Sequence, residues 1–317
     1  MKVRSQRTFM FLLLLSFLFA DVSESISIAP AIGLISRSRI PFFLKRIISS
    51  KLFSSIWNKF KSIFNKALKI GDIANGISDL KEYLQFFGYL NSSTLHSNFT
   101  DEFTENLQSG IIKFQRYFNL SVTGQLDKDI YNIISQPRCG VPDIVNGTTT
   151  TLFKPWWRNA EKKLLTYAFH PENNVTIDVK SLFQDAFNRW SNVTSMEFTE
   201  TTSFNGSNIH IAFLTLDGKG GTVGGGYINS SVNVGSIYLD AEEQWVLSNN
   251  ENVDEDDDVD LESVVMHEIG HLLGLGHSYV KEAIMYPIVL PEKKIELVND
   301  DDLQRIRKIY GVNTTSD

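Results

Sequence analysis

The sequence contains a single cysteine, Cys139, among its 317 residues. One thiol cannot form an intramolecular disulfide, so stability outside a cell would have to come from packing, glycans or metal ions. Basic residues are also in deficit, since 30 lysines and arginines face 37 acids and leave a net charge of −7. A chain without a cationic surplus lacks the charge that holds nucleic acid, which excludes that class of partner. Hydrophobic residues make up 42% of the chain, enough for two folded units.

Long hydrophobic runs are absent except for one near the N-terminus, from Phe9 to Ala20. Basic residues precede this run and polar residues follow it, which is typical of a secretory signal peptide, placed here at residues 1–20. The run is shorter than the roughly 20 residues that span a bilayer, so we expect no stable membrane anchor. Asn-x-Ser/Thr acceptor sites are frequent, which favours a secreted glycoprotein in the extracellular space or extracellular matrix. The nine sites are at Asn91, Asn98, Asn119, Asn146, Asn174, Asn192, Asn205, Asn229 and Asn313.

The region from residue 21 to residue 150 is dominated by helical patterns. Residues 25–70 contain nine basic residues and no acid, and their apolar positions from Leu52 to Leu68 recur at helical spacing. Such a stripe usually packs on its own domain, and the alternative is a helix that lies on a membrane surface. The spacing of apolar residues in 73–134 predicts three short helices that form a small domain. No residues in it have the spacing of a catalytic motif, so we expect the domain to act as a cover for another part of the protein. The polar run Thr148–Thr151 then predicts an exposed linker that an activating protease can reach.

The pattern of apolar residues changes after this linker. Short apolar runs predict strands at Leu165–Phe169, Ile209–Leu214 and Ser236–Leu239, and helical spacing predicts a helix at Val179–Trp190. Residues 151–317 are therefore expected to form an α/β domain of the catalytic type behind the helical one.

The pattern H-E-x-x-H-x-x-G-x-x-H, which runs from His267 to His277, is the most informative stretch of the chain. His267 and His271 are one helical turn apart, so both imidazoles can reach a single zinc ion. Gly274 can end the helix in a left-handed conformation, which lets His277 supply the third ligand. The fourth position stays open for water, and Glu268 is placed to take its proton without being a ligand. Chance accounts poorly for eleven residues in this arrangement, so we predict a catalytic zinc ion.

Cys139 occurs in the segment Pro-Arg-Cys-Gly-Val-Pro-Asp, residues 137–143, just before the linker. A thiolate binds zinc better than water does, so Cys139 can fill the open position and leave no nucleophile. Arg138 and Asp143 carry opposite charges and are able to pair and hold the segment. The alternative is an inert free cysteine, which its position between a covering domain and a zinc site disfavours. The sequence therefore predicts a latent zymogen.

These motifs resemble those of the matrixin (matrix metalloproteinase) branch of the metzincin zinc endopeptidases, and most resemble the plant branch without a haemopexin domain. The resemblance implies an α+β fold with a small three-helix prodomain, peptidoglycan-binding-like, ahead of a metzincin α/β catalytic domain. That domain would contain a twisted, mostly parallel sheet and the zinc-binding helix. Residues 21–150 would then be the propeptide, with a cysteine switch at residues 137–143. Met285 resembles the methionine of the tight turn beneath the zinc, which has a packing role. Ser263 falls where relatives line the main specificity pocket, and a small residue there predicts a deep pocket for a long apolar side chain.

The chain departs from the family in the loop at residues 216–221. Typical matrixins hold a second, structural zinc there, but Gly225 and Tyr238 stand where two of its histidines would fall. We therefore expect the second structural zinc to be absent. Acids at other positions match structural calcium ligands of relatives, and carboxylate oxygens suit that ion, although a solvated acid or a helix cap is the alternative. The candidate calcium ligands are Asp240 and Glu243, and Asp178 could supply a second such site.

Together these patterns predict a secreted metalloendopeptidase, expected to be a monomer, that hydrolyses internal peptide bonds of extracellular proteins or peptides. Glu268 would pass the proton of the attacking water to the leaving amine. The alternative is a catalytically weak or inactive secreted zinc-binding module, since the structural-metal loop has changed. Glu268 argues against this alternative, because a binding module has no use for a base. A membrane-active peptide precursor, based on the basic residues 25–70, ranks last.

Overall fold

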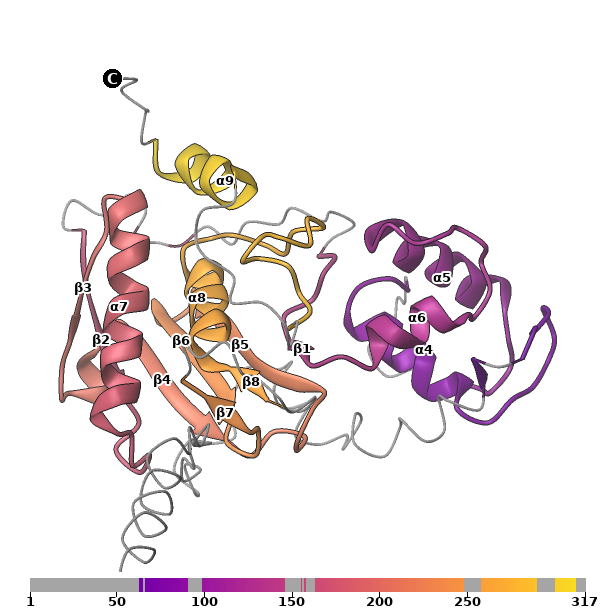
Figure 1. Ribbon diagram of the computed structural model, residues 1–317, viewed down its shortest axis with the longest axis horizontal. Helices are drawn as coiled ribbons and strands as arrows, with labels where there is room; N and C mark the ends of the chain where they lie inside the picture. Colours follow the sequence, from indigo (N-terminus) through magenta and orange to yellow (C-terminus); the bar gives the residue numbers. More distant parts are fainter. Residues whose placement is uncertain are drawn as a thin grey trace, which may run out of the picture.

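The computed structural model describes residues 63–64, 66–90, 99–145, 155, 157, 163–247, 258–289 and 300–311. They form a small helical unit beside a larger unit built on a sheet, with β1 at the junction (Figure 1). Several predicted features lie outside these residues. They are the signal peptide, the linker Thr148–Thr151, most of the basic stretch 25–70, and the acceptor sites Asn91, Asn98, Asn146 and Asn313.

The helical unit contains α4 (Ile77–Phe86), α5 (Glu105–Tyr117) and α6 (Lys128–Ile134), which confirms the three helices predicted from apolar spacing. The side chains of Thr104 and Asp127 cap the first N–H groups of α5 and α6. Aromatic side chains fill the core between these helices, and several of them continue toward β1. The buried aromatic residues are Tyr83, Phe86, Phe87, Tyr89, Phe103, Phe114, Tyr117 and Phe118.

The larger unit is built on a six-stranded sheet with the order β1-β5-β6-β4-β2-β3. Neighbouring strands are parallel except for the antiparallel pair of β5 and β6. This confirms the prediction of a mostly parallel sheet. The strands are β1 (Arg138–Cys139), β2 (Leu164–Phe169), β3 (Glu197–Glu200), β4 (Ile209–Leu214), β5 (Thr222–Asn229) and β6 (Val234–Asp240). Because β1 pairs with β5, the segment that follows the helical unit becomes the edge strand of the catalytic sheet.

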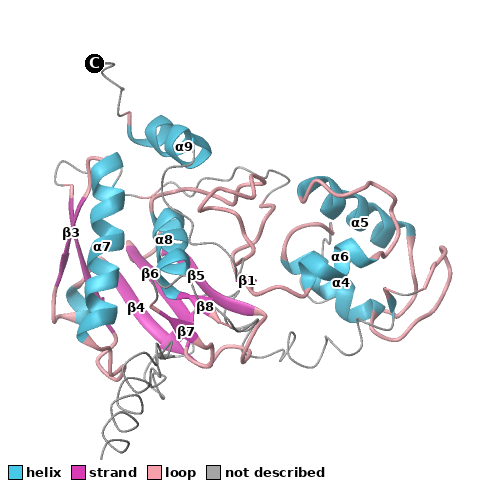
Figure 2. Ribbon diagram, viewed as in Figure 1, coloured by secondary structure: helices cyan, strands magenta, loops and turns pink. Residues whose placement is uncertain are grey.

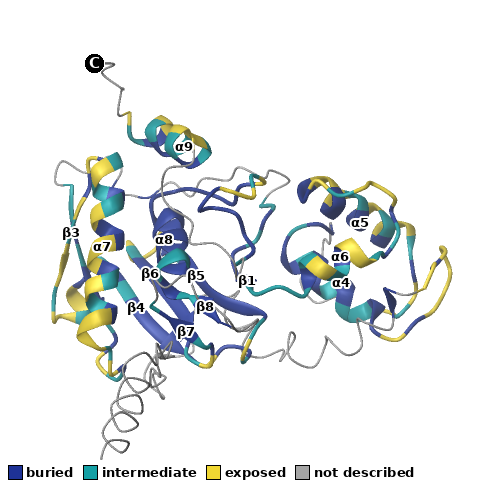
Figure 3. Ribbon diagram, in the orientation of Figure 1, coloured by how far each residue is buried: buried dark blue, intermediate teal, exposed yellow. Residues whose placement is uncertain are grey.

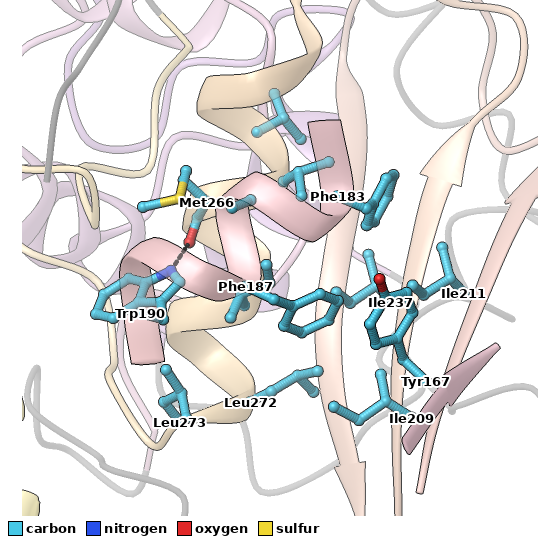
Figure 4. Close-up of a cluster of buried hydrophobic side chains, with 14 of the residues drawn as sticks. Tyr167, Phe183, Phe187, Trp190, Ile209, Ile211, Ile237, Met266, Leu272 and Leu273 are labelled. Carbon is cyan, nitrogen blue, oxygen red and sulfur yellow. Dashed lines mark hydrogen bonds between the residues drawn. The ribbon is translucent and has the colours of Figure 1, made fainter. Parts of the chain in front are cut away.

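Two helices pack against this sheet, α7 (Ile177–Val193) and α8 (Leu261–Leu272), as Figure 2 shows. The Trp190 indole N–H of α7 donates to the carbonyl of Met266 in α8 at 2.9 Å (Figure 4). On the sheet side, the ring of Phe187 stacks on that of Tyr167, with centroids 4.4 Å apart. Every described residue of α8 from Val264 onward is buried, whereas α7 keeps an exposed face (Figure 3). The helix that bears the zinc motif is therefore embedded in the core.

Short elements complete the described structure. They are the 3-10 helix η2 (Phe204–Gly206), the paired strands β7 (Trp245–Val246) and β8 (Val259–Asp260), and the last helix α9 (Asp300–Tyr310). Among the described residues, no helix combines the length and the apolar character that crossing a membrane requires.

Candidate zinc centre

Helix α8 positions the first two histidines. Its N-cap is Asp260, whose carboxylate accepts the Ser263 N–H at 2.7 Å and so fixes where the helix begins. His267 and His271 then lie one turn apart on one face, both buried. The helix approaches β5 so closely that a Cβ on Gly226 would lie 2.4 Å from the carbonyl oxygen of Glu268. A glycine in this strand therefore allows the helix to contact the sheet.

A left-handed glycine turns the chain toward the third histidine. Gly274 has a φ of 100°, a conformation that side-chain-bearing residues rarely adopt. After this turn His277 returns to the helix, and its Nε2 lies 3.2 Å from the Nε2 of His271. The predicted role of Gly274 as a helix stop thus matches the backbone of the structure.

The second ring nitrogen of each histidine faces an acceptor. His267 Nδ1 lies 2.7 Å from the Ile284 carbonyl, and His271 Nδ1 lies 2.8 Å from the Leu275 carbonyl. Neither carbonyl can donate, so both Nδ1 atoms carry the proton and both Nε2 lone pairs are free for a ligand. Burial lowers the pKa of His267 to about 3, which keeps its imidazole neutral. The histidines are therefore held in the protonation state that binds metal.

Cys139 completes a four-atom cluster with the three histidines. Its Sγ lies 3.4 Å from His271 Nε2, and all four potential ligand atoms lie within 4.8 Å of one another. Among the described residues this is the one group found to converge in this way. Burial raises the pKa of the Cys139 thiol, so a thiolate here needs a cation beside it. Three neutral imidazoles and one sulfur, all buried, match the donor set of a tetrahedral zinc site.

Glu268 lies at the same site without belonging to the ligand cluster. It is completely buried, and its nearest polar neighbours are the Cys139 thiol and the backbone of Gly226. Burial raises the pKa of Glu268 to about 8, which favours the proton-bearing form in the absence of a cation. A carboxylate held in this way can take up a proton and release it near neutral pH.

The segment that delivers Cys139 is fixed by a buried ion pair. The Arg138 guanidinium donates to Asp143 Oδ1 at 2.6 Å and to the hydroxyl of Tyr83 at 2.9 Å, and its Cζ lies 3.4 Å from the ring centroid of Phe87. The Tyr89 hydroxyl donates to the other carboxylate oxygen of Asp143 at 2.7 Å. The pairing of Arg138 with Asp143 that the sequence suggested is thus present, and it rests on aromatic residues of the helical unit.

A pocket with mainly apolar walls opens beside Glu268. Ser263 contributes to the lining, as its position in the sequence suggested, together with His267 and Val264 from the same helix. Cys139 also lines this pocket.

Met285 lies beneath the histidines in the core, completely buried, and makes a packing contact with α8. The backbone N–H groups of Ile284 and Met285 donate to the carboxylate of Asp302 at 2.6 and 3.3 Å. The end of the chain in α9 thereby holds the methionine turn, a contact that the sequence analysis did not anticipate.

Three buried acids lie at the loop between β4 and β5. The Asp240 carboxylate accepts the N–H groups of Asp217 and Gly218 at 3.1 and 3.2 Å, and Glu243 accepts that of Gly220 at 3.1 Å. Burial, followed by the charges of Asp240 and Glu243, raises the pKa of Asp217 to about 9. Asp217 belongs to this group and was missed, although its place in a glycine-rich loop next to a strand was a usable signal.

Asp178 does not join this group of acids. It is exposed in the first turn of α7. His170 and His210 both contact the ring of Phe204, His170 edge-on with centroids 5.0 Å apart and His210 stacked at 4.2 Å. The absence of a second structural zinc stays a prediction.

Comparison with known proteins agrees with this geometry. A family model for matrixin matches residues 156–311, and one for a putative peptidoglycan binding domain matches residues 74–134. The chain is 38% identical to metalloendoproteinase 5-MMP of Arabidopsis thaliana over 87% of this chain and 86% of that protein. It is 39% identical to metalloendoproteinase 1 of Glycine max over 77% of this chain and 84% of that protein. The chain therefore belongs to the matrixin family of metalloendopeptidases.

Proposed function

We propose that this protein is a secreted zinc endopeptidase, made as a latent zymogen, that cleaves proteins of the extracellular space or matrix. The observation that carries the proposal is the position of Cys139 Sγ, 3.4 Å from His271 Nε2 and within the ligand cluster. A thiolate in the fourth ligand position would exclude the water that the reaction needs. Cleavage of the linker by an activating protease would release it.

The residues of the site have distinct tasks in this proposal. His267, His271 and His277 would hold the zinc ion, which when bound would polarise the scissile carbonyl and acidify the attacking water. Glu268 would take a proton from that water and pass it to the nitrogen of the leaving amine. Its complete burial supports this role, because burial raises the pKa of Glu268 to about 8, close to the pH at which it would accept and release the proton.

The pocket beside Glu268 would receive the side chain that follows the cleaved bond. Its mainly apolar walls, with the small Ser263 in the lining, favour a long apolar side chain. Asp240 and Glu243 would supply carboxylate oxygens to a structural calcium ion, since both are buried and hard oxygen ligands suit that ion. Acceptor sites such as Asn174 and Asn205 are exposed, as glycosylation requires.

The decisive experiment uses purified proprotein and a quenched fluorescent peptide. We expect no cleavage until a mercurial modifies Cys139, followed by cleavage that a chelator abolishes. Glu268→Ala serves as the matched control, because it removes the base but none of the zinc ligands. If folded, zinc-loaded protein without its propeptide cleaves nothing in a broad peptide library, the inactive zinc-binding module becomes the better description.

A further inference from the structure

The third histidine differs from the other two in the origin of its hydrogen-bond partner. His267 and His271 donate from Nδ1 to backbone carbonyls of the catalytic unit itself. His277 Nδ1 instead lies 2.7 Å from Asp143 Oδ1, a carboxylate of the propeptide segment 134 positions earlier in the chain. Both side chains are completely buried. One ligand of the catalytic unit is therefore oriented by a residue that activation removes.

The Asp143 carboxylate is held for this contact from three sides. Oδ1 accepts from Arg138 as well as from His277, and Oδ2 accepts from the Tyr89 hydroxyl. The contact with Arg138 is an ion pair at 2.6 Å between two buried side chains. The group is thus an anion whose oxygens are already aimed, as a partner that orients a metal-bound histidine should be.

We propose that Asp143 is a positioning residue of the zinc centre, so that the propeptide stabilises bound zinc through His277 as well as through Cys139. A carboxylate that accepts the Nδ1 proton fixes the ring and makes Nε2 a stronger ligand, and loss of such a partner typically costs 10–100-fold in metal affinity. The propeptide would then secure zinc in the newly made protein, and its removal would leave a more weakly held ion. This inference rests on the proposed zymogen function.

The test measures zinc affinity of the full-length proprotein by competition with a fluorescent chelator. All variants carry Glu268→Ala so that no sample removes its own propeptide. We compare the parent with Cys139→Ser, Asp143→Asn and the combination of both. Tyr89→Phe is the matched control, since it removes a hydrogen bond from the other oxygen of the same carboxylate.

We expect Asp143→Asn to weaken zinc binding about tenfold or more, both with Cys139 and in the Cys139→Ser background, and Tyr89→Phe to change it much less. If Asp143→Asn has its effect only when Cys139 is present, the residue acts by placing the thiol and the proposal is overturned. If Cys139→Ser leaves zinc affinity unchanged, the zymogen function fails instead, so the two failures are distinguishable.

A second measurement decides the matter if Asp143→Asn does not fold. In zinc-loaded, ¹⁵N-histidine-labelled proprotein, the His277 Nδ1 proton should exchange slowly with water, because a buried carboxylate holds it. After cleavage and separation of the propeptide, the same proton should exchange faster. Equal exchange rates before and after removal would overturn the proposal.

Discussion

Gly270 contacts Met285 so closely that a Cβ built on the glycine would lie 2.3 Å from the methionine Sδ. The same Cβ would lie 3.2 Å from the ring of Trp190. Both neighbours are buried, so neither side chain has free space to move into. The glycine between the first two zinc ligands is therefore required by packing against the methionine turn, in addition to any role in the motif.

We expect Gly270→Ala to lower the free energy of unfolding by about 1–3 kcal/mol, since overpacking of a dense core outweighs the better helix propensity of alanine. Urea unfolding of the Glu268→Ala proprotein measures this. Met285→Ala makes the space that the new methyl group needs, so the double variant should lose less than the sum of the two single losses. Strict additivity of the two effects would contradict the proposed contact.

A pH effect is expected from Asp302, which accepts the backbone N–H groups of the methionine turn. Burial raises the pKa of Asp302 to about 6, above its ordinary value of 3.8. The folded state thus binds this proton more tightly, so the associated stability is full below pH 3.8 and disappears as the pH rises through about 6.

Asp302→Asn does not titrate and keeps one acceptor oxygen for the turn. The wild-type free energy of unfolding, measured relative to this variant, should fall by at most about 3 kcal/mol between pH 4 and pH 7. Denaturant titrations of both proteins at one-unit pH steps provide the comparison. A difference that is constant over this range would show that Asp302 does not titrate there.

Calcium should stabilise the protein through the buried acids Asp240 and Glu243. With zinc held constant, millimolar calcium should raise the thermal unfolding midpoint by several degrees, and Asp240→Asn should abolish this rise. Asp178→Asn is the matched control, because Asp178 is an exposed acid of the same unit and lies outside the cluster. Without calcium, Asp217→Asn should be about as stable as the wild type at neutral pH, because burial raises the pKa of Asp217 to about 9 and keeps it uncharged there. Loss of the calcium effect in Asp178→Asn would instead assign the ion to α7.

The sequence predicted those features that depend on residues close to one another along the chain. Apolar spacing placed the helices of both units, and the eleven-residue motif placed His267 and His271 on α8 and His277 in the turn that follows it. The strand β5, next to the edge of the sheet, was not predicted. Gly224, Gly225 and Gly226 interrupt the alternation of β5, which becomes a strand because β6 and β1 supply partners on both sides. A strand defined by its neighbours gives little signal of its own.

Contacts between distant segments were also beyond prediction. The pair of Arg138 and Asp143 spans five positions and could be proposed from charge alone, whereas the bond from His277 to Asp143 joins two units of the fold. Similarly, Asp217 joins Asp240 and Glu243 only through the path of the loop between β4 and β5. Such contacts depend on tertiary packing, which no short-range pattern encodes.

The lining of the pocket beside Glu268 leads to a prediction of specificity. Ser263 is the small residue among mainly apolar neighbours, so Ser263→Phe should fill much of the space that a long side chain would use. We expect kcat/KM for peptides with leucine after the cleaved bond to fall at least tenfold, while peptides with alanine there change little, because only the larger side chain loses its room. Ser203→Phe, at an exposed serine outside the pocket lining, is the matched control and should leave both values unchanged. If Ser263→Phe lowers both values equally, the residue supports the fold of α8 and does not select the substrate.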